Sequence, residues 1–223
     1  MGAPSAADFE EGLTTGDWRV MSTHLPWHID LLPWYVFAAY WGLTALTVKR
    51  AKVTEKSADR LATLAVMVTA FVLLFYEWPS TGPLRLHFAP AERWIVWFGV
   101  AITTLGVVLA IWARRCLGEY WSARVTLKQD HQLIRSGPYR YVRHPIYTGM
   151  LLGAVGRAIT IGEWRGVLAV ALILVAHSRK ALREQRMLAG EFGEEYARYC
   201  GETGFLFPRV WPNSRMDTRS KHP

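Results

Sequence analysis

The chemically richest stretch of this 223-residue sequence runs from residue 137 to residue 149 and reads GPYRYVRHPIYTG. Pro145 disfavours the α conformation at His144 and suits the first position of a helix. An apolar run follows, so we expect His144 to lie where a helix begins at the membrane boundary. The free N–H groups of that helix start, beside Arg143, favour an anionic ligand. An interfacial turn anchored at the lipid headgroups fits the same residues, so both interpretations remain open.

A second polar group lies about forty residues further on. Lys180 and Glu184 are four residues apart and would therefore share one face of a helix. A carboxylate at this place could hold the ammonium group of a ligand, and the lysine could hold a carboxylate. The alternative is an ordinary surface ion pair, which contributes little to stability.

Other kinds of site lack their residues in this sequence. His131 and His144 are thirteen residues apart and have no paired carboxylates nearby, so we expect no catalytic metal. The sequence has no nucleophile elbow, no P-loop and no Gly-x-Gly-x-x-Gly pattern. Cys116 and Cys200 are its two cysteines, too few for a disulfide framework or a thiolate metal site.

The polar residues must be positioned by the long apolar blocks that separate them. Three blocks have nearly the length needed to cross a bilayer core of ~30 Å as helices, and they cover residues 29–48, 61–78 and 94–113. Two shorter blocks, 145–161 and 164–177, predict a helical hairpin. Fourteen helical residues rise only about 21 Å, so this hairpin need not cross fully.

The hairpin carries small and charged residues with different expected roles. Gly149, Gly153 and Gly156 would let another helix approach closely. Arg157 and Glu163 lie near the hairpin tip, where we expect both side chains to reach the far interface. After residue 177 the pattern predicts an amphipathic helix, broken at Gly190 or Gly193. The predicted fold class is therefore an all-α integral membrane protein whose hairpin and amphipathic helix enclose a pocket.

The charge pattern gives a predicted orientation. The formal net charge is +8, but the basic residues fall between apolar blocks, which indicates membrane sidedness rather than nucleic-acid binding. Loops rich in Lys and Arg follow the first and third blocks. This predicts an outside N-terminus and a cytoplasmic 139–147 segment. We divide the chain into a mobile N-terminus without a signal-peptide pattern, three transmembrane helices, a catalytic region and a tail, with bounds 1–28, 29–113, 114–211 and 212–223.

Several motifs in residues 114–211 resemble the isoprenylcysteine carboxyl methyltransferase family. The phospholipid methyltransferases belong to the same wider group. The motifs are His131-Gln132-Leu133-Ile134, Ser136-Gly137-Pro138-Tyr139, Arg143-His144-Pro145-Ile146-Tyr147, Glu184 and Phe192-Gly193-Glu194-Glu195-Tyr196. The resemblance implies an integral membrane enzyme that binds S-adenosylmethionine in a cytoplasmic pocket.

The resemblance also assigns residues to that pocket. The cofactor-binding residues that it implies are Arg124, His131, Gln132, Leu133, Ile134, Tyr139, His144, Pro145, Ile146, Tyr147 and Glu184. Lys180 stands where the isoprenylcysteine enzymes have an arginine that holds the acceptor carboxylate, and Arg143 is a second candidate for substrate binding. Lysine lacks the bidentate fork of arginine, which makes isoprenylcysteine itself a doubtful substrate.

Methyl transfer from a sulfonium needs a donor and an acceptor held in line, with water excluded, and no triad or metal. The resemblance therefore implies transfer to a lipidic or small apolar acceptor, with carboxylate O-methylation as the first hypothesis. Phospholipid or amine N-methylation is an alternative. A sterol-reductase-type enzyme using NADPH is another, but Glu184 would repel the phosphates of a dinucleotide. A non-catalytic membrane scaffold that kept the pocket is the third.

Overall fold

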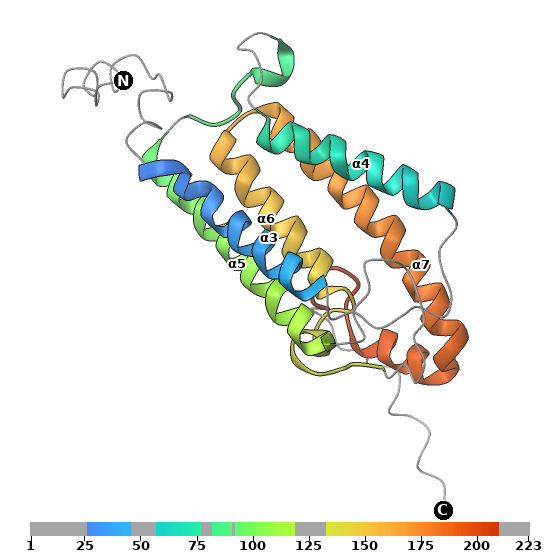
Figure 1. The fold of residues 1–223 in the computed structure, drawn as a ribbon. Helices are drawn as coiled ribbons and strands as arrows, with labels where there is room; N and C mark the ends of the chain where they lie inside the picture. Colours follow the sequence, from blue (N-terminus) through green and yellow to red (C-terminus); the bar gives the residue numbers. More distant parts are fainter. Residues whose placement is uncertain (1–25, 46–56, 77–81, 91, 119–132, 210–223) are drawn as a thin grey trace, which may run out of the picture.

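The structure is a computed structural model, and it describes residues 26–45, 57–76, 82–90, 92–118 and 133–209. Within these residues the fold is all-helical. The five α-helices are α3 (Leu32–Ala45), α4 (Ser57–Phe75), α5 (Arg93–Leu117), α6 (Pro145–Ile161) and α7 (Trp164–Glu202). Three short 3₁₀ helices accompany them, η1 (Pro26–Leu31), η2 (Pro83–Arg85) and η4 (Gly137–Arg140). In Figure 1, α5, α6 and α7 run along one another, α3 lies against α5, and α4 crosses α7.

Helices α5 and α6 meet at their backbones because glycines face each other at the contact. A Cβ added to Gly106 of α5 would lie 2.4 Å from the nitrogen of Gly153 in α6. A Cβ on Gly156 would lie 2.4 Å from the nitrogen of Thr103. Both distances are too short for any side chain. The close helix packing expected from the glycines of residues 149–156 is therefore confirmed, and α5 is the partner helix.

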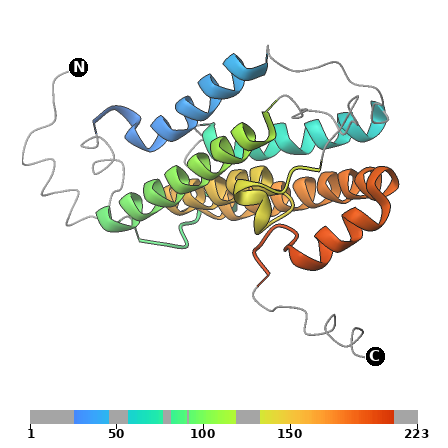
Figure 2. The ribbon, with the colours of Figure 1, turned by 90° about the horizontal axis from the view of Figure 1, so that it is seen from below.

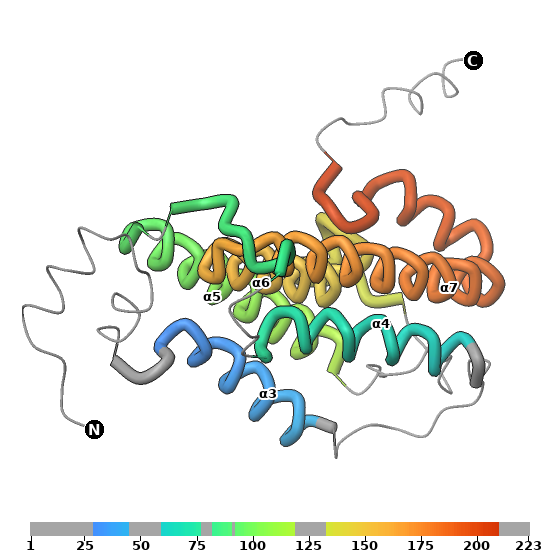
Figure 3. The backbone as a smooth tube through the Cα atoms, turned by 90° about the horizontal axis from the view of Figure 1, so that it is seen from above, coloured from blue at the N-terminus to red at the C-terminus, as the bar shows by residue number. Residues whose placement is uncertain are grey.

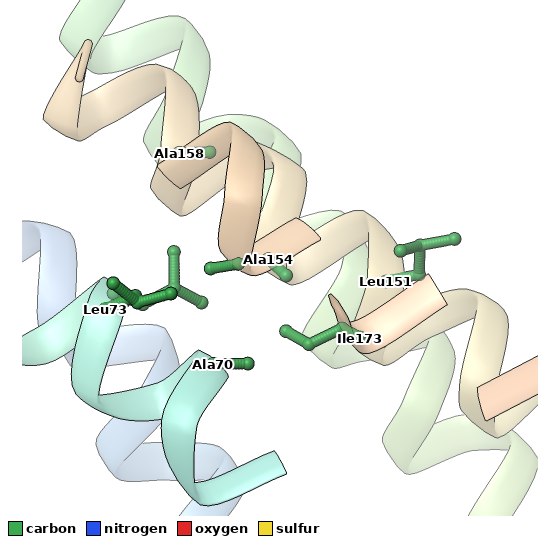
Figure 4. Close-up of a cluster of buried hydrophobic side chains, with 8 residues drawn as sticks. Ala70, Leu73, Leu151, Ala154, Ala158 and Ile173 are labelled. Atoms are coloured by element: carbon green, nitrogen blue, oxygen red, sulfur yellow. The ribbon is translucent and has the colours of Figure 1, made fainter. Parts of the chain in front are cut away.

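The main apolar core lies where α4, α6 and α7 meet. Leu73 and Leu74 of α4 pack against Leu151 of α6 and Ile173 of α7, and alanines fill the spaces between them. Figure 4 shows Leu73 of α4, Ala154 of α6 and Ile173 of α7 gathered in this core. Small residues on α6 let the neighbouring helices approach closely. Helix α6 therefore packs against α4 and α7 in this core and against α5 at the glycine contact.

Much of the outer surface is apolar. Leu43 of α3, Trp94 of α5 and Leu105 of α5 are each more than half exposed. Among the described residues, α5 is the helix that is both long enough and apolar enough to cross a bilayer. Helix α6 is also apolar but has 17 residues. The structure thus gives one clear membrane span and a second, shorter apolar helix, where the sequence predicted three full transmembrane helices.

The helix bounds differ from the prediction at the first two blocks. Helix α3 has 14 residues and follows the 3₁₀ turn η1, so its described part is shorter than the predicted 29–48 span. Pro33 lies in its first turn, where a proline is tolerated. Helix α4 begins at Ser57, before the predicted start at residue 61, because Asp59 and Arg60 continue its first turn. Residues 46–48 and 77–78 of the predicted spans lie outside the described residues.

The predicted hairpin helix and the predicted amphipathic helix are one element. Helix α7 continues from Trp164 to Glu202 and does not end at residue 177. No glycine or proline occurs from residue 167 to residue 189, so the change from apolar to polar residues does not interrupt the backbone. The predicted break is confirmed at Gly193, which has φ 49° and ψ −121°. Figures 2 and 3 show the last part of α7 folding back after this kink.

The expectation that Arg157 and Glu163 reach the far interface is wrong. Glu163 is 1% exposed and accepts bonds from Arg165 at 2.5 Å and from Arg85 at 2.7 Å. Arg157 pairs with Asp30 and also donates to the carbonyl of Leu74.

Arg157 and Arg165 point inward because the C-terminal end of α4 is close to them. The last carbonyl groups of that helix have no partners within it and accept bonds from both arginines. Arg165 donates to the carbonyls of Leu73 and Tyr76, at 2.7 and 2.9 Å. We call this set the far-end cluster, and its members are Asp30, Arg85, Arg157, Glu163 and Arg165.

Candidate active site

The segment around η4 forms one wall of the site. Gly137 has φ +59°, a left-handed conformation that favours glycine, and a Cβ there would lie 2.6 Å from Sγ of Cys116. Tyr139 is buried and packs with Ala113 and Ile146. The turn predicted from Gly137 and Pro138 is confirmed, and it presses this segment onto the end of α5.

The chain after α7 pairs with the same segment. The N–H of Arg143 donates to the carbonyl of Gly204 at 2.9 Å, and the N–H of Gly204 donates to the carbonyl of Tyr141 at 3.0 Å. Tyr199 of α7 donates its hydroxyl proton to the carbonyl of Tyr139 at 2.7 Å. Two segments far apart in the sequence are thus joined through their backbones. His144 is the next residue, so its position depends on this pairing.

Glu184 of α7 lies at the centre of the site. The hydroxyl of Tyr147, in the first turn of α6, donates to its Oε1 at 2.5 Å. Nδ1 of His144 lies 3.5 Å from its Oε2. The two residues come from the motif His-Pro-x-Tyr and therefore face α7 together, since His144 is the N-cap of α6 and Tyr147 lies one turn further on.

Aromatic rings stack beside the carboxylate. The ring of Tyr147 is stacked on His144 at 5.6 Å between centroids and on His177 at 4.8 Å. The Nζ of Lys180 lies 5.5 Å from the centroid of the Tyr147 ring, within the range of a cation–π contact. Phe205 approaches His144 edge-on at 5.4 Å. A cationic group would find electron-rich ring faces and a carboxylate in the same place.

The electrostatics favour an ionised Glu184. Burial alone would raise its pKa, but the hydrogen bond from His144, the charge of Lys180 and the bond from Tyr147 together lower the pKa below 4.5. Burial raises the pKa of Tyr139 well above its ordinary value, and the negative charge of Glu184 adds to this effect. At neutral pH the site therefore holds a carboxylate next to a neutral phenol.

The structure brings four of the sequence-predicted site residues into direct contact, namely His144, Tyr147, Lys180 and Glu184. Pro145 occupies the first turn of α6, and Ile146 packs with Tyr139. Leu133 and Ile134 are half-buried, and Ile134 packs against the same cluster. Arg124, His131 and Gln132 lie outside the described residues.

The guanidinium of Arg143 is bonded to the backbone at the end of α7. Its Nη1 donates to the carbonyls of Cys200 and Thr203, at 3.0 and 2.5 Å. These contacts hold the end of α7 against the residues before α6. A role in substrate binding stays a prediction, and the observed contacts give Arg143 a positioning role.

Two residues of this site were not selected from the sequence. His177 precedes Lys180 by three residues and Glu184 by seven, a spacing that places all three on one helix face and could have revealed it. Phe205 had no such signal, because its contact with His144 depends on the chain turning back after α7. Among the described residues, no group of three or more His, Cys, Asp or Glu side chains is arranged to hold a metal ion.

Comparison with known proteins agrees with this geometry. The sequence profile of the phospholipid methyltransferase family matches residues 94–195, which include η4, α6 and Glu184. The match covers slightly less than half of the chain, and several relatives named protein-S-isoprenylcysteine O-methyltransferase match as well. The resemblance seen in the motifs is thereby confirmed.

Individual relatives carry different names. Protein-S-isoprenylcysteine O-methyltransferase of Schizosaccharomyces pombe is 34% identical over 99 residues, which cover 38% of this chain and 42% of the relative. The cobalt-zinc-cadmium resistance protein CzcN of Cupriavidus metallidurans is 34% identical over 123 residues, covering 53% of this chain and 55% of that protein. The chain thus spans about half the length of these curated relatives.

A solved structure of the eukaryotic intramembrane Ras methyltransferase ICMT also resembles this chain. It has 21% sequence identity and a TM-score of 0.49, and the match covers 83% of this chain and 70% of the other.

Proposed function

We propose that this protein is an integral membrane methyltransferase that takes a methyl group from S-adenosylmethionine and moves it to a lipidic or small apolar acceptor. The observation that carries the proposal is the ionised Glu184, held by Tyr147 and His144 within the region that matches the methyltransferase family. In this proposal the carboxylate would receive the ammonium group of the cofactor.

The residues present fit that cofactor. Each carboxylate oxygen can accept two hydrogen bonds, and Tyr147 and His144 occupy one position on each oxygen of Glu184. Two positions remain for an ammonium group. The stacked rings of Tyr147 and His177 offer faces that attract a sulfonium. The proposed cofactor-binding residues are Leu133, Ile134, Tyr139, His144, Pro145, Ile146, Tyr147 and Glu184, together with Arg124, His131 and Gln132.

The bound cofactor would supply a methyl group on a positively charged sulfur. The residues of the chain would bind and orient the two reactants and exclude water. Lys180 would lie on the acceptor side, where it could attract a carboxylate or phosphate. An acceptor carboxylate would need no base, whereas an amine or thiol would have to lose a proton. We place the site on the cytoplasmic side, with the N-terminus outside, on the distribution of basic residues.

The test is calorimetric titration of detergent-purified protein with S-adenosylmethionine and, separately, with NADPH. We expect the wild type to bind S-adenosylmethionine only and Glu184→Ala to lose measurable affinity. Glu191→Ala is the matched control, because Glu191 is an exposed glutamate on the same helix. Binding of NADPH without binding of S-adenosylmethionine would overturn the proposal in favour of a reductase.

A purified protein that binds the cofactor is then incubated with radiolabelled methyl donor and a panel of acceptors. The panel contains prenylated cysteine, long-chain carboxylic acids, aminophospholipids and small apolar thiols. Label in any organic product, absent with Glu184→Ala, supports the enzyme. Cofactor binding without transfer to any acceptor would favour the scaffold instead.

A further inference from the structure

A groove lies inside the bend of α7, between the two limbs that meet at Gly193. Its volume is about 350 Å³. The arm after Gly193 folds back beside the first limb, as Figures 2 and 3 show, so both limbs contribute walls. We call it the bend groove, and its lining includes Leu182, Gln185 and Arg186 from the first limb and Tyr196 and Cys200 from the arm.

The bend groove is separate from the candidate active site. At about 100° of rotation per residue, Leu182, Gln185 and Arg186 are centred roughly 150° around the helix from Glu184. None of the residues assigned above to the cofactor lines the groove. The two features therefore lie on nearly opposite faces of the same helix.

Two polar groups in this lining are buried without a hydrogen-bond partner among the described residues. They are the hydroxyl of Tyr196 and Nε2 of Gln185. Tyr196 is 3% exposed, and the neighbouring thiol of Cys200 is only a weak hydrogen-bond partner. Burial raises the pKa of Tyr196 above its ordinary value, so the phenol is neutral and can donate. Both groups therefore favour a ligand that brings acceptor oxygens.

The charge of the groove has one sign. Among the described residues, its lining holds one charged side chain, Arg186, and no carboxylate. Arg143 also acts electrostatically on the hydroxyl of Tyr196. Glu194 and Glu195, which follow the bend, lie outside the lining. A guanidinium, an amide and a phenol that all donate hydrogen bonds match an anion with several oxygens, such as a phosphate group.

The position of the groove along α7 brings it to the membrane boundary. Leu182 follows His177, the last residue of the apolar block, by five positions, which is about 7.5 Å along the helix. The headgroup layer on each side of a bilayer core is about 5–7.5 Å thick. The groove thus lies at the level of lipid headgroups, and Leu182 gives it an exposed apolar wall.

We propose that the bend groove binds an anionic membrane phospholipid. Its phosphate would accept hydrogen bonds from Arg186, Gln185 and Tyr196, and the start of an acyl chain would lie against Leu182. Other arginines precede Arg186 on the same helix, and a run of basic residues at a membrane boundary attracts anionic headgroups. This site goes beyond the proposed function and does not depend on it.

A lipid in the groove would hold the two limbs of α7 together. A Cβ added to Gly193 meets nothing within 4 Å, so side-chain packing at the kink does not fix the angle between the limbs. The arm carries Tyr199, whose hydroxyl donates to the carbonyl of Tyr139. Bound lipid would therefore also steady one wall of the candidate active site.

The first experiment locates the lipid by photo-crosslinking. Full-length protein is placed in phosphatidylcholine nanodiscs with a trace of phosphatidylglycerol that carries a diazirine next to its headgroup, and labelled peptides are identified by mass spectrometry. We expect label within residues 182–200. In Arg186→Gln this label should fall about fivefold, the usual effect of one basic residue on binding to anionic lipid.

The matched control is Arg198→Gln, because Arg198 is an exposed arginine of the arm that does not line the groove. An equal fall in this control would show general attraction of anionic lipid and overturn the site. Equal labelling of residues 182–200 by a phosphatidylcholine probe, or label confined to other residues, would also overturn it.

The second experiment measures thermal unfolding of detergent-purified protein with phosphatidylglycerol, phosphatidylcholine or inorganic phosphate. We expect phosphatidylglycerol alone to raise the Tm of the wild type, because a ligand that binds the folded state stabilises it. The rise should be smaller in Tyr196→Phe, which keeps the ring but not the hydroxyl. Unfolding without lipid shows that each variant is folded.

The remaining outcomes have separate meanings. An equal rise with inorganic phosphate would indicate a site for free anions and overturn the lipid, and no rise with phosphatidylglycerol would overturn the inference as a whole. Neither experiment uses S-adenosylmethionine, so failure here leaves the methyltransferase standing. Failure of the methyltransferase would likewise leave the lipid site in place.

Discussion

At the scale of single residues, the site depends on a short contact between a phenol and a carboxylate. Tyr147 both stacks with two histidines and donates to Glu184. The resemblance predicts that Tyr147 and Glu184 line one pocket, because both belong to motifs of the family. It could not predict that His177 completes the stack, since a lone histidine on an apolar helix face has many possible roles.

Tyr147→Phe should separate the two tasks of this side chain. The ring and its stacking remain, but Glu184 loses the bond at 2.5 Å that orients it. Hydrogen bonds to charged groups contribute about 1.5–3 kcal/mol, so we expect affinity for S-adenosylmethionine to fall roughly tenfold or more in calorimetry. Tyr141→Phe is the control, since Tyr141 is 59% exposed. Equal affinities in both variants would contradict this role of the hydroxyl.

The lowered pKa of Glu184 predicts a pH dependence of stability. Its folded-state pKa lies below its ordinary value, so ionised Glu184 stabilises the fold above its unfolded-state pKa. This contribution disappears as the pH falls through the folded-state pKa. We therefore expect the difference in Tm between the wild type and Glu184→Gln to shrink below pH 4.5. Thermal unfolding in detergent from pH 7 to pH 3 measures it, and a difference that grows on acidification would show a raised pKa instead.

At the scale of elements, the sequence predicted which helices exist better than where they end. The apolar blocks predict where helices form, because a bilayer core sets their length. The glycines of α6 predict a close helix contact, because they have no side chain. The change from apolar to charged residues between Val175 and Arg179 predicts a boundary, but α7 continues because no helix-breaking residue interrupts the backbone there. The pairing of Arg143 with Gly204 joins segments 61 residues apart, and no local pattern predicts it.

The glycine contact between α5 and α6 gives the sharpest test of the packing. Gly106→Ala would place a Cβ 2.4 Å from a backbone nitrogen, which cannot move without shifting a helix. We expect a loss of about 1–3 kcal/mol or more, seen as a lower Tm and a lower yield of folded protein. Gly42→Ala is the matched control, because a Cβ there meets nothing within 4 Å. Similar Tm values for the two variants would contradict the close backbone contact between α5 and α6.

At the scale of the whole molecule, polar groups gather at two levels along α7, at its first turn and near its middle. Glu184 belongs to the site, and the far-end cluster lies beside the first turn of the helix. The ion pair between Asp30 and Arg157 spans 127 residues of sequence. Burial of these charges could not be predicted, because their partners include carbonyl groups at the end of α4 that become close only in the folded protein.

The far-end cluster should contribute strongly to stability. Glu163→Gln would leave Arg85 and Arg165 without the carboxylate that both contact. Removal of one partner from a buried ion pair typically costs about 3–5 kcal/mol. We expect a large fall in Tm in thermal unfolding, whereas Glu92→Gln, at an exposed position, should change it little. An unchanged Tm for Glu163→Gln would mean that water satisfies these arginines.

The unbroken α7 has a consequence for the lipid environment. Glu184 follows Trp164 by twenty positions, and at 1.5 Å per residue the helix holds them about 30 Å apart. This spacer has a fixed length close to the thickness of a bilayer core. In a thicker or thinner bilayer, the depth of the pocket relative to the headgroups would change, because the helix cannot shorten. Turnover in vesicles should therefore depend on acyl-chain length, with a maximum where the hydrophobic thickness matches this distance.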